Sequence, residues 1–197
     1  GNVARAWVAG GEGGMGKRRV AGLFAVNLLC ERGGPEGCGQ CHSCIQTAAG
    51  THPDLIFVTH EKPASIGVDD VREQIQDSIV IRPYSGRYKI YIVDEAEKMT
   101  VQAQNALLKT IEEPPSYGVI LLLTANQDSF LPTILSRCVQ LKCRPVGDEA
   151  GKRYLMEKID ISEEKGDICW GCARGSSGKM MDFSTSAQFQ NMYYRVV

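Results

Sequence analysis

Long hydrophobic runs are missing from this sequence, and so is the pattern of a secretory signal. No stretch approaches the roughly 18 consecutive apolar residues that indicate a membrane-spanning helix. The start of the chain, GNVARAWVAG, lacks a positively charged segment followed by an apolar one. These absences predict a cytoplasmic protein.

An excess of positive charge is also missing. The 197 residues carry a formal net charge of -1, with 43% hydrophobic and 23% charged residues. This balance is typical of a globular protein and argues against tight DNA binding by the chain alone. Internal repeats and low-complexity tracts are absent as well. The length predicts one full domain with a smaller second one.

Short β-rich runs alternate with helical patterns up to about residue 145. They occupy residues 4–9, 54–59, 88–93, 119–124 and 139–142. Five strands separated by helices predict an α/β domain with a mostly parallel five-stranded sheet and helices on both faces. We assign residues 1–145 to this domain. From residue 146 to 197 the β pattern fades into charged helical segments, which predicts a small α-helical second domain.

One helix can be placed closely from the sequence. Thr100 is a suitable N-cap for a helix over residues 101–113, and Pro114 follows it as a stop signal. The side chains expected on the buried stripe of this helix are Ala103, Ala106, Leu107 and Thr110.

A glycine-rich loop follows the first strand and precedes a helical run. It fits the GxxxxGK pattern of a phosphate-binding loop. The candidate nucleotide-binding residues are Gly11, Gly13, Gly14, Gly16, Lys17 and Arg18. Glycines let successive backbone N–H groups face a polyphosphate, and the lysine ammonium would bridge its outer oxygens. The next position normally holds a Ser or Thr whose hydroxyl binds Mg²⁺, but here it is Arg18. We therefore expect weak ATP or ADP binding and inefficient hydrolysis.

Two acidic residues follow the apolar strand at 88–93. Asp94 would hold the metal through water and Glu95 would activate the attacking water of a nucleotide hydrolase. The competing interpretation is a solvated strand end without catalytic work.

Four of the eight cysteines crowd into a short segment, in a C-x7-C-x2-C-x2-C pattern formed by Cys30, Cys38, Cys41 and Cys44. Four thiolates can close a tetrahedral zinc site with no open position, which indicates a structural zinc knuckle at residues 30–44 and not a catalytic metal. His42 is a rival ligand. Cys169 and Cys172 also form a CxxC pair, but they lack a second pair, so core packing is favoured there.

The segment DEAEKMTVQAQNALLKTIEEPPSYGVILLLTANQDSFLPTILSRC resembles the clamp-loader branch of the AAA+ ATPases. With the glycine loop and the cysteine knuckle, the resemblance extends over residues 1 to about 145 and is greatest to bacterial DNA polymerase III delta-prime subunits, with gamma/tau subunits second. It implies a P-loop AAA+ RecA-like domain followed by a helical lid domain. Family members continue into a third, oligomerising collar domain, so we expect this chain to be truncated.

The resemblance also implies roles for two further residues. Arg137 in Ser136-Arg137-Cys138 would be the arginine finger, which acts in trans on the nucleotide of a neighbouring subunit, and Asn126 would occupy the polar sensor position. Gamma-type subunits carry Ser or Thr where this chain has Arg18, and a GSxR arginine where it has Gly178. Both departures favour delta-prime, although Lys179 is a possible substitute that keeps the ATPase alternative open.

The sequence is compatible with three functions. The leading hypothesis is a clamp-loader subunit in a five-subunit ring with gamma/tau-type and delta-type subunits, which helps load the sliding clamp onto primed DNA in DNA replication. The second is a gamma/tau-type ATPase that hydrolyses ATP with its own Lys17, Asp94 and Glu95. The third, a zinc-dependent DNA-binding module, is disfavoured because the segment PEGCGQCHSC contains no Lys or Arg.

Overall fold

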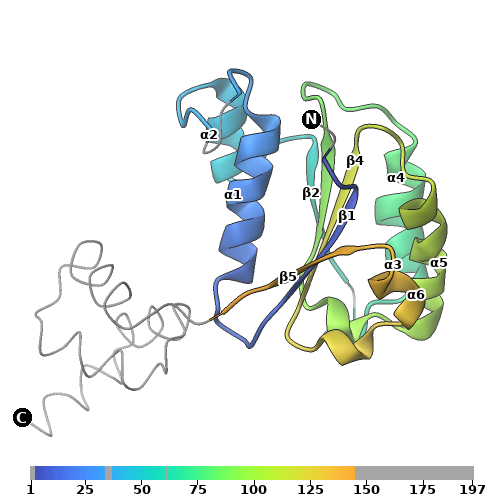
Figure 1. Cartoon of the computed structure of the whole chain (residues 1–197). Helices are drawn as coiled ribbons and strands as arrows, with labels where there is room; N and C mark the ends of the chain where they lie inside the picture. Colours follow the sequence, from blue (N-terminus) through green and yellow to red (C-terminus); the bar gives the residue numbers. More distant parts are fainter. Residues whose placement is uncertain (1–2, 34–36, 61, 145–197) are drawn as a thin grey trace, which may run out of the picture. The chain divides into compact units, whose positions relative to one another are not determined.

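The computed structural model describes residues 3–33, 37–60 and 62–144 (Figure 1). Contacts divide the chain into two compact units, of which the first comprises Gly1–Gly10 and Lys17–Lys142. The second contains the glycine loop Gly11–Gly16 and Cys143–Val197, and it is described separately. The predicted helical domain at residues 146–197, with Cys169, Cys172, Gly178 and Lys179, lies outside the described residues.

The first unit is built on a five-stranded sheet with the order β2-β3-β4-β1-β5. Every neighbouring pair of strands is parallel, as the alternation of strands and helices predicts. All five expected strands are present, with bounds at β1 Ala6–Gly10, β2 Leu55–Val58, β3 Lys89–Val93, β4 Gly118–Thr124 and β5 Val139–Lys142.

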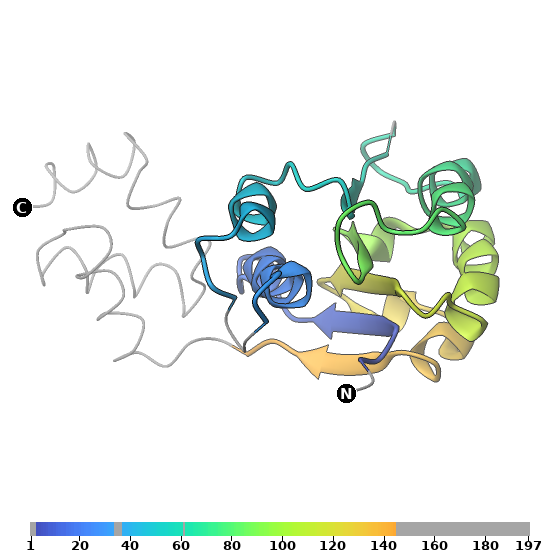
Figure 2. The same cartoon turned by 90° about the horizontal axis from the view of Figure 1, so that it is seen from above.

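Helices cover both faces of this sheet, so the expected layered architecture is confirmed (Figures 1 and 2). One face carries α1 (Lys17–Leu29) and α2 (His42–Ala48). The other carries α3 (Val68–Val71), the π-helical turn η1 (Arg72–Gln76), α4 (Asp77–Ile79), α5 (Val101–Glu112) and α6 (Pro132–Leu135). Two short 3₁₀ turns complete the described elements, η2 (Ala96–Lys98) and η3 (Gln127–Ser129).

The core lies around β3 and β4, whose residues are all buried. Strands covered on both faces need apolar side chains on both faces, which explains the continuous runs KIYIV and GVILLLT. Tyr91 is fully buried in this core, and its hydroxyl lies 2.8 Å from the Ser78 hydroxyl, so its polar end is satisfied. Among the described residues, no helix is long and apolar enough to cross a membrane.

Asp54 anchors the loop that leads into β3. Its carboxylate is buried and accepts hydrogen bonds from the backbone N–H groups of Tyr84, Ser85 and Gly86 at 2.6, 2.8 and 2.9 Å. Burial alone would raise the pKa of Asp54, but these three donors outweigh it and hold the pKa below its ordinary value. The loop is thereby fixed before the strand that carries Asp94 at its end.

The helix expected over residues 101–113 is observed as α5, and its predicted cap is confirmed. The Thr100 hydroxyl accepts a hydrogen bond from the Ala103 N–H at 3.2 Å. Ala103, Leu107 and Thr110 are buried as predicted, and Ala106 is half-buried. Gln104 is also buried, which the apolar pattern did not indicate.

Candidate functional site

The glycine loop of the second unit needs glycine at two places. Gly14 and Gly16 have φ angles of 81° and 74°, in the left-handed region that glycine adopts without strain. Within the loop, the Met15 N–H donates to the Glu12 carbonyl at 3.4 Å. Gly11 packs closely on Cys143, where a Cβ would lie 2.8 Å from the Cys143 carbonyl oxygen. Lys17, the next residue along the chain, is the first residue of α1.

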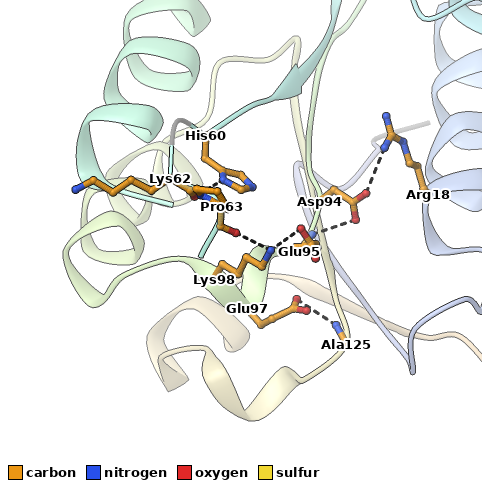
Figure 3. Close-up of polar contacts among 9 residues, drawn as sticks. All are labelled: Arg18, His60, Lys62, Pro63, Asp94, Glu95, Glu97, Lys98 and Ala125. Carbon is orange, nitrogen blue, oxygen red and sulfur yellow. Dashed lines mark hydrogen bonds and ion pairs between the residues drawn. The ribbon is translucent and has the colours of Figure 1, made fainter. Parts of the chain in front are cut away.

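Arg18 is held in place by two residues of the first unit. Its guanidinium lies 3.6 Å from the Asp94 carboxylate (Figure 3). It also lies 5.1 Å from the centre of the Phe57 ring. The first contact is an ion pair and the second a cation–π interaction, because a ring face within about 6 Å attracts a cation. Asp94 also accepts the N–H of Glu95 at 3.0 Å. The carboxylate predicted to hold a metal through water therefore faces a cation of its own chain.

Glu95 is paired in a similar way. Its carboxylate accepts a hydrogen bond from the Lys98 ammonium at 2.7 Å, and this ammonium also donates to the Pro63 carbonyl at 2.9 Å (Figure 3). The hydrogen bond from Lys98 lowers the pKa of Glu95, which makes its carboxylate a weaker base. Glu95 adopts a left-handed backbone conformation with φ 48°, the one positive φ among the non-glycine residues that the structure describes.

The sensor candidate Asn126 follows β4 and caps the η3 turn. Its side-chain oxygen accepts the Asp128 N–H at 3.0 Å, and its own N–H donates to the Thr124 hydroxyl at 3.0 Å. One residue earlier, the Ala125 N–H donates to the Glu97 carboxylate at 3.2 Å (Figure 3). The end of β4 is thus linked to the segment that carries Asp94 and Glu95.

The predicted cysteine cluster is present. The sulfur atoms of Cys30, Cys38, Cys41 and Cys44 lie within 4.8 Å of one another, so the cluster could bind a metal ion. The Cys38 and Cys44 sulfurs are 3.9 Å apart. A tetrahedral zinc site with Zn–S bonds of about 2.3 Å has sulfur–sulfur edges of about 3.8 Å, so this donor set fits such an ion.

Backbone donors prepare the cluster for thiolates. The N–H groups of Gln40 and Cys41 lower the pKa of Cys38 to about 6. Burial raises the pKa of Cys44 to about 12, an effect that a bound cation reverses because a coordinating thiol loses its proton. The cluster also joins α1 to α2: Cys30 directly follows α1, and Cys41 is the N-cap of α2.

Arg137 directly follows α6 and Ser136, and it precedes the edge strand β5. Its guanidinium Nε lies 2.9 Å from the Glu112 carboxylate, and Nη1 donates to the Thr133 carbonyl at 3.1 Å and to the Ser136 hydroxyl at 3.3 Å. The side chain is 41% exposed. Arg137 is therefore oriented by its own chain while staying accessible at the surface.

Several partners of the candidate residues were not predicted from the sequence. They are Phe57 beside Arg18, Lys98 beside Glu95, and Glu112 beside Arg137. Of these, only Lys98 carried a signal in the sequence, since Glu95 and Lys98 stand three residues apart in a helical turn and have opposite charge.

Solved structures define the class of this fold. A DNA polymerase III gamma subunit-related protein from Thermotoga maritima superimposes with a TM-score of 0.59 at 23% identity, over 98% of this chain and 73% of that one. RuvB, the Holliday junction branch migration motor of Thermotoga maritima, also gives 0.59 at 12% identity, over 97% of this chain and 56% of that one. Together with the parallel sheet and the glycine loop, this likeness shows the fold of P-loop AAA+ proteins.

A family model narrows the class further. The model described as "DNA polymerase III, delta subunit" matches residues 1–147. The chain therefore belongs to this family of DNA polymerase III subunits, which confirms the resemblance to the clamp-loader branch.

Curated relatives fall on both sides of the delta-prime and gamma/tau distinction. DNA polymerase III subunit delta' of Pseudomonas aeruginosa is 41% identical over 79% of this chain and 48% of the relative. Subunit gamma of Buchnera aphidicola is 34% identical over 83% and 46%, and subunit tau of Escherichia coli is 35% identical over 83% and 25%. The chain spans about half or less of the length of these relatives.

Proposed function

We propose that this chain is the N-terminal part of a delta-prime-type clamp-loader subunit, which offers Arg137 to the ATP of a neighbouring subunit and does not hydrolyse ATP efficiently itself. The observation that carries this proposal is the ion pair between Arg18 and Asp94. Arg18 stands in the position of the metal-binding hydroxyl. Its positive charge is paired with the Asp94 carboxylate, which would otherwise hold Mg²⁺ through water.

The pairing of Glu95 supports the same function. A general base must be able to accept a proton, but the Glu95 carboxylate is engaged by Lys98 and has a lowered pKa. Metal binding and water activation are thus both opposed by cations of the same chain. We further propose that the subunit acts in a five-subunit ring with gamma/tau-type and delta-type subunits that places the sliding clamp on primed DNA.

Nucleotide binding by the purified chain is expected to be weak and nearly independent of Mg²⁺, and ATP turnover is expected to stay near background. The physical reason is that Arg18 already supplies positive charge where the metal would sit. The Arg18→Thr variant introduces the hydroxyl and frees Asp94, so Mg²⁺ should then strengthen ATP binding. Titrations of ATP with and without Mg²⁺ measure both expectations.

Arg19→Thr is the matched control, since it removes the adjacent arginine while Arg18 stays. It should leave the Mg²⁺ dependence unchanged. Sustained, Mg²⁺-dependent turnover by the unmodified chain that disappears on Lys17→Ala would reject the delta-prime function and favour a gamma/tau-type ATPase.

The second part of the proposal concerns the metal. We propose that Cys30, Cys38, Cys41 and Cys44 hold one structural zinc ion, because four sulfur donors leave no position for a substrate. Within residues 30–44, the Glu31 carboxylate forms a second link between the two ends of the segment. It accepts hydrogen bonds from the Ser43 N–H at 3.1 Å and from the Ser43 hydroxyl at 2.9 Å. The metal would order the loop between Cys30 and Cys41, because this segment has no hydrophobic core of its own.

Cys41→Ser is expected to reduce the zinc content from one ion per chain to a small fraction and to loosen α2, while the sheet stays folded. The sheet should survive because its core is formed by other elements. Elemental analysis measures the metal, and amide hydrogen exchange separates α2 from β3 and β4. Cys143→Ser, outside the cluster, is the control and should keep its zinc. Protein purified without chelator that contains no zinc would contradict the assignment.

A further inference from the structure

Gln104 is a buried polar side chain on the first turns of α5, only 2% exposed. Its Nε2 donates to the Met99 carbonyl at 3.3 Å and to the Ser129 carbonyl at 3.0 Å. Its Oε1 accepts the Leu131 N–H at 2.8 Å. One side chain therefore ties the beginning of α5 to the segment between β4 and α6.

Such a buried amide enforces one arrangement of the chain. Its neighbours include the apolar core residues Met99, Ala103 and Phe130, so a donor or acceptor that loses its partner here is not compensated by water. Leu131 is the N-cap of α6, and its N–H has no partner inside that helix. The amide of Gln104 supplies this partner and thereby fixes where α6 begins.

The start of α6 determines where Arg137 lies. The Leu131 carbonyl accepts the N–H groups of Ile134 at 2.9 Å and of Leu135 at 3.2 Å. The Ile134 carbonyl in turn accepts the Arg137 N–H at 3.1 Å. Leu131 and Arg137 are thus joined by consecutive helical turns, and a shift at Leu131 is passed to Arg137.

Helix α5 also contacts this segment at its other end, at Arg137. Glu112, in the last turn of α5, binds the Arg137 guanidinium at 2.9 Å. With a rise of about 1.5 Å per residue, Gln104 and Glu112 lie about 12 Å apart along α5. Helix α5 therefore contacts the segment that carries Arg137 at two places. Gln104 binds the beginning of this segment, and Glu112 binds the Arg137 side chain.

We propose that Gln104 is a positioning residue for Arg137, with Glu112 as the second contact through which α5 sets the direction of the guanidinium. This inference rests on the proposed function of Arg137 as an arginine donated to a neighbour's ATP. It assigns no direct contact between Gln104 and nucleotide.

The test uses a clamp loader reconstituted from complete subunits, with substitutions in this one. Gln104→Met keeps the length of the side chain and removes all three hydrogen bonds. Because displacement of a catalytic group by about 1 Å can cost about 100-fold, we expect kcat for ATP hydrolysis at the neighbouring site to fall between about 10-fold and 100-fold. The KM for ATP should stay within about twofold, since Arg137 is expected to act on the transition state.

Gln76→Leu is the matched control. Gln76 also donates a side-chain hydrogen bond to α5, at 2.7 Å to the Ala106 carbonyl, but its side chain forms no hydrogen bond to the described residues 129–137. Its loss should leave kcat unchanged. A fall in kcat equal to that of Gln104→Met would mean that any weakening of α5 is sufficient, and it would overturn a specific role for Gln104.

A double-mutant comparison separates this inference from the proposed function. If Gln104 acts through Arg137, Gln104→Met should have no further effect on kcat in an Arg137→Ala background. An undiminished effect in that background overturns the inference. Unchanged turnover with Arg137→Ala alone overturns the proposed function instead.

Glu112→Gln provides a second, exposed variant in case Gln104→Met does not fold. Glu112 is 46% exposed, so its replacement should leave folding intact. We expect a smaller fall in kcat that is again absent in the Arg137→Ala background. Full activity of both Glu112→Gln and a folded Gln104→Met, beside a slowed Arg137→Ala loader, would show that α5 does not position the arginine.

Discussion

A clamp loader assembled with the Arg137→Ala form of this subunit is expected to hydrolyse ATP on the order of 10³-fold more slowly at the site that Arg137 faces. A guanidinium delivered across an interface stabilises charge that develops on the transferring phosphoryl group, so its loss affects the transition state more than bound ATP. Turnover stimulated by clamp and primed DNA, measured at matched assembly, is the appropriate readout.

The structure sets the controls for this experiment. Arg137 and Glu112 form an exposed ion pair, so Arg137→Ala should change the free energy of unfolding by less than about 1 kcal/mol. Arg137→Lys should rescue little, because an ammonium lacks the planar fork of a guanidinium. Arg72→Ala removes an exposed arginine that is paired with Asp69 at 3.9 Å, and it should have no effect. Unchanged turnover in both Arg137 variants would mean that Arg137 is an ordinary surface residue.

The largest loss of stability is expected from Asp54→Ala. This change leaves the backbone N–H groups of Tyr84, Ser85 and Gly86 without their acceptor. Hydrogen bonds to charged groups contribute about 1.5–3 kcal/mol each, and some of this is recovered as water enters, so we expect a loss of about 3 kcal/mol or more. Denaturant unfolding measures it. Asp69→Ala, whose carboxylate side chain is 83% exposed, should change stability by less than about 0.5 kcal/mol.

The contribution of Asp54 should also depend on pH. Because its folded-state pKa lies below the ordinary value of 3.8, the stabilisation is complete above that value and is lost as the pH falls toward the folded-state pKa. The difference in unfolding free energy between wild type and Asp54→Asn should therefore be constant near neutral pH and shrink below about pH 4. A difference that persists unchanged in stronger acid would contradict the role of the ionised carboxylate.

Much of the fold could be predicted from the sequence because the relevant signals are local. The run KIYIV is apolar at almost every position and β-branched at three, which indicates a strand buried on both faces, and β3 is such a strand. Thr100 could be identified as a cap because its hydroxyl acts within one turn. The cysteine cluster was predictable for a similar reason, since its four cysteines lie within a short stretch of chain.

Contacts between segments that lie far apart in the sequence could not be predicted from local signals. Gln104 falls beside the predicted apolar stripe of its helix, so its burial became visible only once residues 129–131 were seen against α5. Glu112 and Arg137 likewise meet only because α6 folds back on α5. The pairing of Arg18 with Asp94 depends on β3 lying near α1, although the missing hydroxyl at position 18 already indicated altered metal binding.

The sheet order also constrains how the protein can fold during its synthesis. Strand β1 is interior, and its partners are β4 and β5, with Ala6 opposite Ile120 and Trp7 opposite Val139. Among the five strands of this sheet, β1 is synthesised first, whereas its two partners, β4 and β5, are synthesised last. Until β4 has been synthesised, both edges of β1 are unpaired, and unpaired strand edges promote aggregation of a nascent chain.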